Sequence, residues 1–173
     1  GHGLGSTPKI VIYKDRGVGT WYVLYTFVDG SQDYLVLNGT NASAGLDSAT
    51  YGTATSTTIS NIGFTNGNNM IAYAFADVKG FSKMDSYVGN GSTDGTFVYT
   101  GFKPAFIMFK RTNSTSGWGM YDNKRTPFNL MNKRLLANTS GAEDTSADNG
   151  INFLSNGFKW KTGSGWNASG GSY

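Results

Sequence analysis

Glycine, asparagine, serine and threonine interrupt this sequence so often that an amphipathic helix has almost no room to form. Such a helix needs apolar residues that recur every three or four positions over several turns, and the interruptions break that spacing. Between them lie short runs of β-branched and aromatic residues, which are typical of strands bounded by turns. The runs cover residues 10–13, 21–27, 34–37, 57–64, 70–75, 96–100, 106–109, 118–121 and 151–160. The sequence therefore predicts an all-β fold.

The spacing of these runs favours an antiparallel β-sandwich. Residues 130–137 are the one weak helical candidate, but they carry no capping signature and fit a strand equally well. With 173 residues, of which 38% are apolar, the chain has the size and the apolar content of one ordinary domain. It contains no cysteine, so disulfides and thiolate chemistry are excluded and packing must stabilise the fold.

The chain also repeats itself at an offset close to 96 residues. The matched segments are 5–14 with 101–110, 35–38 with 135–138, and 61–64 with 155–158. We interpret residues 1–173 as a single sandwich domain with an internal two-fold duplication. It is built from repeats at about 5–76 and 101–173, with a connecting strand pair at 77–100.

The repeat predicts which residues superpose. Trp21 should lie over Trp118, Tyr25 over Tyr121 and Phe64 over Phe158, and the two tryptophans are expected to pack between sheets. The second copy stops before its last strand, so we expect either a longer polypeptide or an open sheet edge.

Several motifs lie along the chain, in both copies and in the segment between them. They are His2-Gly3-Leu4-Gly5-x-x-Pro8, Ser86-Tyr87-x-Gly89-Asn90-Gly91, Arg125-x-Pro127-x-Asn129 and Phe153-Leu154-Ser155-Asn156-Gly157-Phe158. Together they resemble the repeat module of bacteriophage and marine-virus tail and tail-fibre proteins, over essentially the whole chain. The resemblance implies a concanavalin-like jelly roll in a virion-surface or extracellular protein that attaches to a host through glycans. Other virion subunits are further partners that it implies, and it supplies no catalytic residues.

The sequence argues against two kinds of partner, nucleic acids and membranes. The net charge is +3, but the cations are spread along the chain and form no basic stripe, so we expect no nucleic-acid binding. No apolar run approaches the ~20 residues that span a bilayer, so we expect no membrane insertion.

Acid–base groups are too scarce to suggest an enzyme. Glu143 is the only glutamate and His2 the only histidine, and the aspartates show no paired arrangement of the kind that glycoside hydrolysis needs. We therefore expect a chain without catalytic residues and without a required cofactor.

Two loops rich in aspartate leave room for a structural calcium ion. One carries Asp29 and Asp33, and the other carries Asp85 and Asp94. Calcium accepts such carboxylate oxygens, but Asp-Gly and Asn-Gly turns explain both loops equally well.

Large aromatic residues are the candidates for sugar binding, because a pyranose ring stacks its C–H face on a flat apolar surface. Trp160 and Trp166 have no tryptophan counterpart in the first copy, so we expect both to be partly exposed; the alternative is that they cover the end of the sandwich. Tyr87, Tyr99 and Arg125 are further candidates. The sequence thus favours a non-catalytic carbohydrate-binding module, with a purely structural virion domain without a glycan ligand as the alternative.

Overall fold

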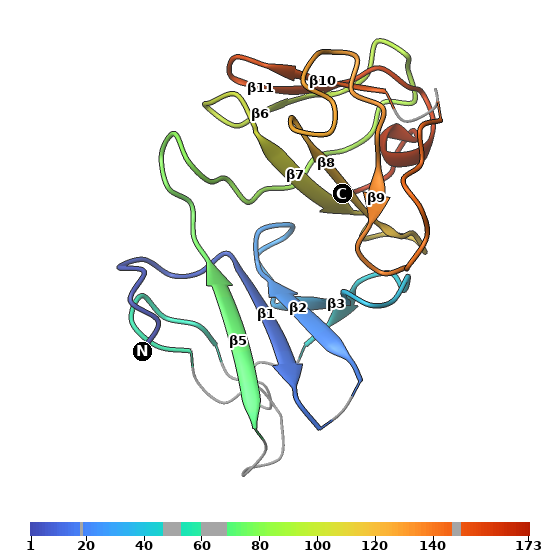
Figure 1. Ribbon diagram of the computed structural model, residues 1–173. Coiled ribbons are helices and arrows are strands. Elements are labelled where there is room, and N and C mark those ends of the chain that lie inside the picture. Colours follow the sequence, from blue (N-terminus) through green and yellow to red (C-terminus); the bar gives the residue numbers. More distant parts are fainter. Residues whose placement is uncertain (18, 47–52, 60–68, 147–149) are drawn as a thin grey trace. The chain divides into compact units, whose positions relative to one another are not determined.

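The computed structural model describes residues 1–17, 19–46, 53–59, 69–146 and 150–173 (Figure 1). Within these ranges the regular structure is antiparallel β-strand, apart from the three-residue 3-10 helix η2 (Gly165–Asn167). The predicted all-β antiparallel fold is confirmed. Among the described residues no helix has the length and apolarity to cross a membrane.

Contacts divide the chain into two compact units. The first comprises Gly1–Gly39, Ser43–Val78 and Ser82–Asp85, and the second comprises Thr40–Ala42, Lys79–Phe81 and Ser86–Tyr173. The boundary falls inside the predicted connecting segment at 77–100, of which the part from Ser86 onwards belongs to the second unit.

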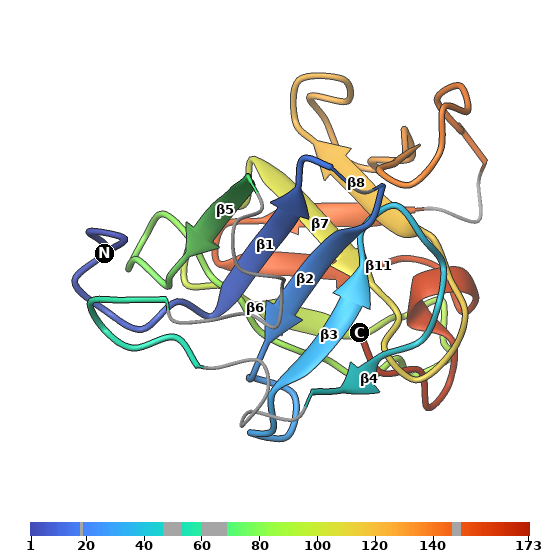
Figure 2. The ribbon, with the colours of Figure 1, turned by 90° about the horizontal axis from the view of Figure 1, so that it is seen from below.

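The first unit contains one five-stranded sheet in the order β4-β3-β2-β1-β5 (Figure 2). Its strands are β1 (Ile10–Asp15), β2 (Trp21–Tyr25), β3 (Asp33–Val36), β4 (Ala44–Gly45) and β5 (Met70–Phe75). Val11, Tyr13 and Leu24 form a buried cluster on one face, as the alternation of strand side chains requires.

The second unit contains two three-stranded sheets, in the orders β10-β11-β6 and β7-β8-β9. The strands are β6 (Phe97–Tyr99), β7 (Phe106–Lys110), β8 (Trp118–Asp122), β9 (Leu135–Leu136), β10 (Ile151–Leu154) and β11 (Gly157–Trp160). Phe109 of β7 meets Trp160 of β11 edge to face, with ring centroids 5.1 Å apart. Residues of both sheets therefore share one core, which is the arrangement of a β-sandwich.

The predicted strand runs match most of these elements, with three differences. Residues 151–160 form the hairpin β10–β11, which turns at residues 155 and 156. Residues 130–137 contain β9 and no helix. The run at 57–64 lies partly outside the described residues, and Ile59 makes only an isolated bridge to Ala54.

The repeated residues occupy the same positions in the meanders β1–β2–β3 and β7–β8–β9. Lys14 pairs with Trp21 across β1 and β2, and Lys110 pairs with Trp118 across β7 and β8. Each lysine also donates its ammonium to the carbonyl of the next residue, at 2.6 Å from Lys14 and 2.7 Å from Lys110. The repeated lysines therefore have a structural role at the ends of β1 and β7.

Two repeated asparagines close the meanders in the same way. The Oδ1 of Asn38 accepts from the backbone N–H of Trp21 at 3.0 Å, and the Oδ1 of Asn138 accepts from that of Trp118 at 2.9 Å. An amide at this position therefore fixes the start of β2 and of β8 against the segment that follows the third strand.

The register corrects one predicted pair. With Trp21 and Trp118 aligned, Tyr121 corresponds to Leu24, because Tyr121 lies opposite Ile107 as Leu24 lies opposite Val11. The predicted superposition of Tyr25 on Tyr121 is wrong by one position, and one position in a strand turns a side chain to the other face. Phe64 lies outside the described residues, and the jelly roll and whole-chain duplication stay predictions.

A buried asparagine joins the loop before β6 to the end of the chain. Asn167 has no exposed surface. Its Nδ2 donates to Asn90 Oδ1 at 2.8 Å, to Ser92 O at 2.9 Å and to Thr162 O at 2.7 Å. Its Oδ1 accepts from the backbone N–H groups of Asn90 at 3.2 Å and Thr96 at 3.3 Å. One side-chain amide thus satisfies five groups of backbone and side chain.

Glycines allow this approach of two segments. A Cβ at Gly89 would lie 2.3 Å from Ala168 O, and a Cβ at Gly95 would lie 2.6 Å from Trp160 O. Any larger residue at either position would push the two segments apart. The motif at residues 86–91 therefore has a structural role as a clamp: it holds the C-terminal segment in place through close backbone packing and hydrogen bonds.

We expect Asn167→Ala to destabilise the protein by at least ~1–3 kcal/mol, because buried groups lose their partners. Asn167→Asp should be worse at neutral pH, since a carboxylate would face the three acceptors that now receive the amide N–H groups. Urea unfolding measures both effects, with the exposed Asn41→Ala as control. Equal stability of Asn167→Ala and Asn41→Ala would contradict the role of Asn167 as a clamp.

Candidate functional site

The structure places the two predicted tryptophans in the core of the second unit. Trp160 is 0% exposed and Trp166 is 6% exposed, so the expectation that both are partly exposed is wrong. Trp160 lies against Phe109 and Tyr121, and Trp166 meets the ring of Phe109 at 5.1 Å. Both residues fill the space between the two sheets, and neither offers a ring face for stacking.

Tyr87 and Arg125 are also engaged within the protein. Tyr87 stacks on Tyr173 at 4.9 Å and donates its hydroxyl to Trp166 O, and burial raises the pKa of the Tyr87 phenol well above its usual value. Arg125 donates to Asp122 Oδ2 at 2.6 Å, to Glu143 Oε2 at 3.1 Å and to a backbone carbonyl. Both side chains hold loops in place, so we do not include them in the candidate site.

Tyr99 is the exposed member of the predicted set. It is 65% exposed, and its neighbour Phe97, two residues earlier on β6, is 44% exposed. Val98 between them packs against the core, so alternation along β6 turns the two rings to the outer face of the β10-β11-β6 sheet. Phe97 is a residue that our sequence reasoning missed, although the alternation Phe-Val-Tyr signals it.

The neighbouring strands extend this outer face. On β11, Gly157 lies opposite Tyr99 and Lys159 lies opposite Phe97, and on β10 Leu154 and Asn152 continue the same two rows. A Cβ at Gly157 would come within 3.0 Å of the Phe97 ring, so glycine lets the ring lie across β11. We call this face, formed by Phe97, Tyr99, Asn152, Leu154, Gly157 and Lys159, the aromatic platform.

Backbone hydrogen bonds and an ion pair fix the ends of the platform. The N–H groups of Thr100 and Gly101 both donate to Asn156 O, at 3.0 and 3.1 Å, and tie the end of β6 to the β10–β11 turn. Lys159 Nζ lies 2.6 Å from Asp94 Oδ1, and this hydrogen bond lowers the pKa of the Asp94 carboxyl. The platform therefore combines aromatic rings with polar groups at its rim.

A pocket of about 310 Å³ lies elsewhere in the same unit. Residues from four segments line it: Arg111, the loop before β8, the strand β9 with Arg134, and η2 with Trp166. The loop contributes Thr115, Ser116 and Gly117. We call this cavity the arginine pocket.

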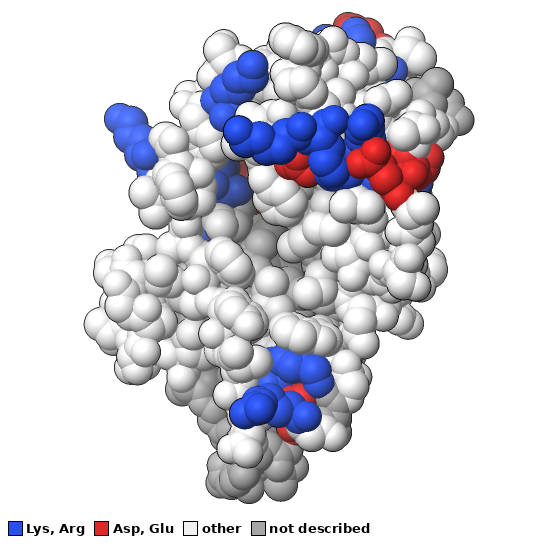
Figure 3. Space-filling model, viewed as in Figure 1, with Lys and Arg blue, Asp and Glu red and all other residues white. Residues whose placement is uncertain are grey.

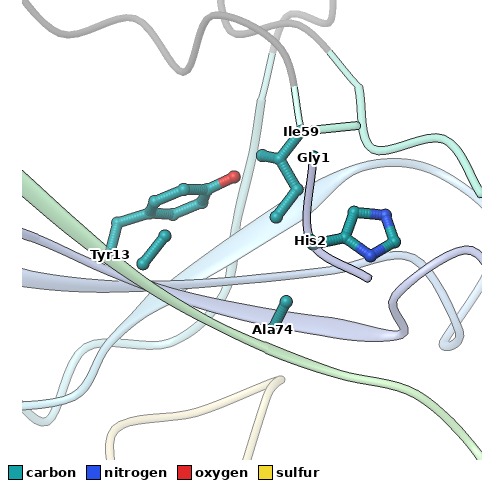
Figure 4. A pocket seen from close by; sticks show the side chains of 6 residues that line it. Gly1, His2, Tyr13, Ile59 and Ala74 are labelled. Atoms are coloured by element: carbon teal, nitrogen blue, oxygen red, sulfur yellow. The ribbon is translucent and has the colours of Figure 1, made fainter. Parts of the chain in front are cut away.

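A second cavity, of about 350 Å³, lies in the first unit (Figure 4). Tyr13, Ile59 and Ala74 line it, and His2 stands at one end. The His2 Nε2 lies 3.0 Å from Thr55 O, and its Nδ1 accepts from Leu4 N at 3.2 Å. Both ring nitrogens thus hold the N-terminal segment.

The predicted calcium ligands are engaged with other side chains. Asp85 pairs with Lys83 at 3.1 Å, and Asp94 pairs with Lys159. Burial and the nearby charge of Asp29 raise the pKa of the Asp33 carboxyl. Asp29 accepts two hydrogen bonds from Ser31, which lower its pKa. Among the described residues no group of three or more histidine, aspartate or glutamate side chains could hold a metal ion, so we derive no step through calcium.

Basic and acidic side chains lie beside each other on one face of the second unit (Figure 3). Glu143 pairs with Arg125 at 3.1 Å and with Lys133 at 3.6 Å, and Arg134 pairs with Asp144. The charges on this part of the surface are therefore largely paired, and the single glutamate is one of the paired groups.

Buried Trp160 gives a direct test of the core. We expect Trp160→Ala to cost ~3–5 kcal/mol of stability, because the change leaves a cavity among the surrounding rings. The exposed Tyr99→Ala should change stability by only about 0.5 kcal/mol or less. Chemical unfolding of both variants measures the difference, and similar effects would show that the burial of Trp160 is misassigned.

Lys110 is a buried cation whose ionisation links stability to pH. It is 3% exposed, and burial lowers the pKa of its ammonium to about 8. In the unfolded chain a lysine keeps its proton up to about pH 10.4. Between these values the unfolded state binds more protons, so the free energy of unfolding should rise with pH.

We expect this rise between pH 8 and about 9.5, below the range in which tyrosines ionise. Lys110→Met should remove it, whereas Lys124→Met, a change at an exposed lysine, should not. Urea unfolding at a series of pH values gives the measurement. A rise that persists unchanged in Lys110→Met would assign the pH dependence to other groups.

Comparison with known proteins gives one finding about identity. No curated protein and no solved structure matches the chain. A family model described as a domain of unknown function (DUF7483) matches residues 1–173. The match extends over both units described above, so the whole chain belongs to the DUF7483 domain family.

Proposed function

We propose that this chain is a non-catalytic carbohydrate-binding module that recognises a polysaccharide or a cell-surface glycan on the aromatic platform. The observation that carries the proposal is the pair of exposed rings, Phe97 and Tyr99, on one face of a β-sheet. Sugar rings present flat C–H faces that stack on aromatic rings, and their hydroxyls bind polar groups at the edge.

The platform suits an extended glycan chain. Residues two apart on a strand are separated by about 6.6–6.8 Å, so Phe97 and Tyr99 can contact neighbouring parts of one sugar chain. Gly157 has no side chain, so the surface over β11 stays low beside Tyr99. Asn152 and Lys159 lie in the row of Phe97. An amide and an ammonium group there can hydrogen-bond to sugar hydroxyls.

The platform is also ordered before a ligand binds. The turn carbonyl of Asn156 holds the end of β6, and Val98 anchors the strand in the core. A surface that does not have to be ordered on binding loses less conformational entropy. This supports a binding role for rings that would otherwise be exposed to water without benefit.

The acid–base groups support a role without catalysis. Glu143 is held by Arg125 and Lys133, and His2 is held by backbone groups of the first unit. The resemblance to viral tail modules supports the same proposal and adds a location at a virion surface, where a glycan receptor would serve host attachment.

We expect Tyr99→Ala and Phe97→Ala to weaken glycan binding by ~1–3 kcal/mol each, the range for losing an anchoring aromatic residue. Melting temperatures should change little, since both rings are exposed. A glycan array identifies the ligand, and affinity gel electrophoresis or titration calorimetry then measures the variants.

Phe81→Ala is the matched control, because Phe81 is 80% exposed and lies in another turn of the second unit. It should bind like the unmodified protein. If Phe81→Ala weakens binding as much as Tyr99→Ala, the platform is not the site. If no glycan binds on the array or in the gels, the proposed function is wrong.

One observation favours the second candidate, a structural virion domain. Among the described residues β7 pairs only with β8, whereas the corresponding strand β1 pairs with both β2 and β5. An unpaired sheet edge is suited to strand addition by another subunit. Association of the isolated chain through β7, together with no glycan binding, would favour this candidate.

A further inference from the structure

We propose that the arginine pocket binds the carboxylate or sulfate group of an acidic sugar, so that the glycan recognised by this chain is anionic. The inference rests on the proposed function and concerns a second surface of the same unit. Arg111, Arg134 and Trp166 carry it, with the hydroxyl groups of Thr115 and Ser116.

Arg111 is the side chain best arranged to receive an oxyanion. Its Nε donates to Asn113 Oδ1 at 2.9 Å, and Asn113 is itself held by Gly170 O and Ser172 N. None of the ion pairs among the described residues involves Arg111. Its terminal N–H groups therefore form an oriented fork of the kind that binds carboxylate or sulfate through two hydrogen bonds.

Arg134 and Trp166 add a second cation and an apolar surface to the lining. The guanidinium of Arg134 lies 4.4 Å from the centre of the Trp166 ring and is held by Asp144. The guanidinium groups of Arg111 and Arg134 are hydrogen-bond donors, so the pocket is complementary to a ligand that brings acceptors.

The dimensions agree with a single sugar unit. A volume of about 310 Å³ lies at the lower end of the range for small-molecule sites. Leu136 and Trp166 supply apolar contact and Thr115 supplies a hydroxyl, while the Ser116 hydroxyl, which donates to Gly117 O, is left as an acceptor. This mixture fits the ring and hydroxyls of a sugar as well as its acidic group.

The repeat supports a binding role for these residues. By the register of the two meanders, Arg111 corresponds to Asp15, and Arg134 corresponds to Tyr34. Lys110, Trp118 and Asn138, which make the same contacts in both units, are common to the two copies. At the two arginines that line the pocket, the second copy thus differs from the first.

The test uses two pairs of polymers that differ only in charge: polygalacturonate with its highly methyl-esterified form, and dextran sulfate with dextran. Affinity gel electrophoresis at fixed ionic strength should show tighter binding to at least one acidic member. Arg111→Gln should weaken this binding by about tenfold to a hundredfold, the effect of losing a hydrogen bond to a charged group. Arg111→Lys keeps the charge without the fork and should also weaken it.

Lys124→Gln is the control, because it removes the same charge from an exposed position outside the pocket. Equal effects of Arg111→Gln and Lys124→Gln, or full binding by Arg111→Lys, would reduce the interaction to general charge attraction and overturn the inference. Displacement by free sulfate as readily as by D-galacturonate would show an oxyanion site without sugar recognition, which also overturns it.

The two proposals fail in different ways. If the chain binds neutral and acidic glycans equally and Arg111→Gln has no effect while Tyr99→Ala does, the arginine pocket is not a site and the proposed function stands. If none of the polymers or array glycans binds, the proposed function itself is wrong.

Discussion

The buried side-chain amide of Asn167 is the interaction on which the second unit depends. The segments that it joins lie outside the strand ladders, so their backbone groups need other partners. One amide with two donors and a carbonyl oxygen supplies them for both segments. Because Trp166 is the preceding residue and lines the arginine pocket, the same contact fixes part of the pocket lining, and Tyr87 strengthens it through Trp166 O.

The two meanders show where structural residues lie relative to the residues of the proposed arginine pocket. The repeated lysine, tryptophan and asparagine residues make the same backbone contacts in both units, so a substitution there would disturb a strand start. Arg111 follows Lys110 and takes part in its contact only through the backbone carbonyl, which leaves the Arg111 side chain outside it. Arg134 directly precedes β9. Side chains next to the repeated residues can therefore differ between the two meanders without disturbing the shared backbone contacts.

The strands could be predicted because their signal is local. Alternating apolar residues and turn residues identify most of the strand runs, and they also indicate that Tyr99 faces outward. The absence of a tryptophan counterpart in the first copy predicts partial exposure for Trp160 and Trp166. Their burial depends on rings from distant parts of the sequence, Phe109 above all, which no local pattern reveals.

The pocket could not be predicted for the same reason, since its lining comes from separate segments that only the fold brings together. Its chemistry also indicates where the proposed selectivity for an acidic ligand has to arise. With a net charge of +3 and only 14% charged residues, the chain has a weak overall field, and salt screens charges beyond about 8–10 Å. A general attraction to polyanions is therefore small. Discrimination between an acidic sugar and its neutral form must come from short-range contacts, and the fork of Arg111, oriented by Asn113, is the group in the described part of the pocket that is arranged to make them.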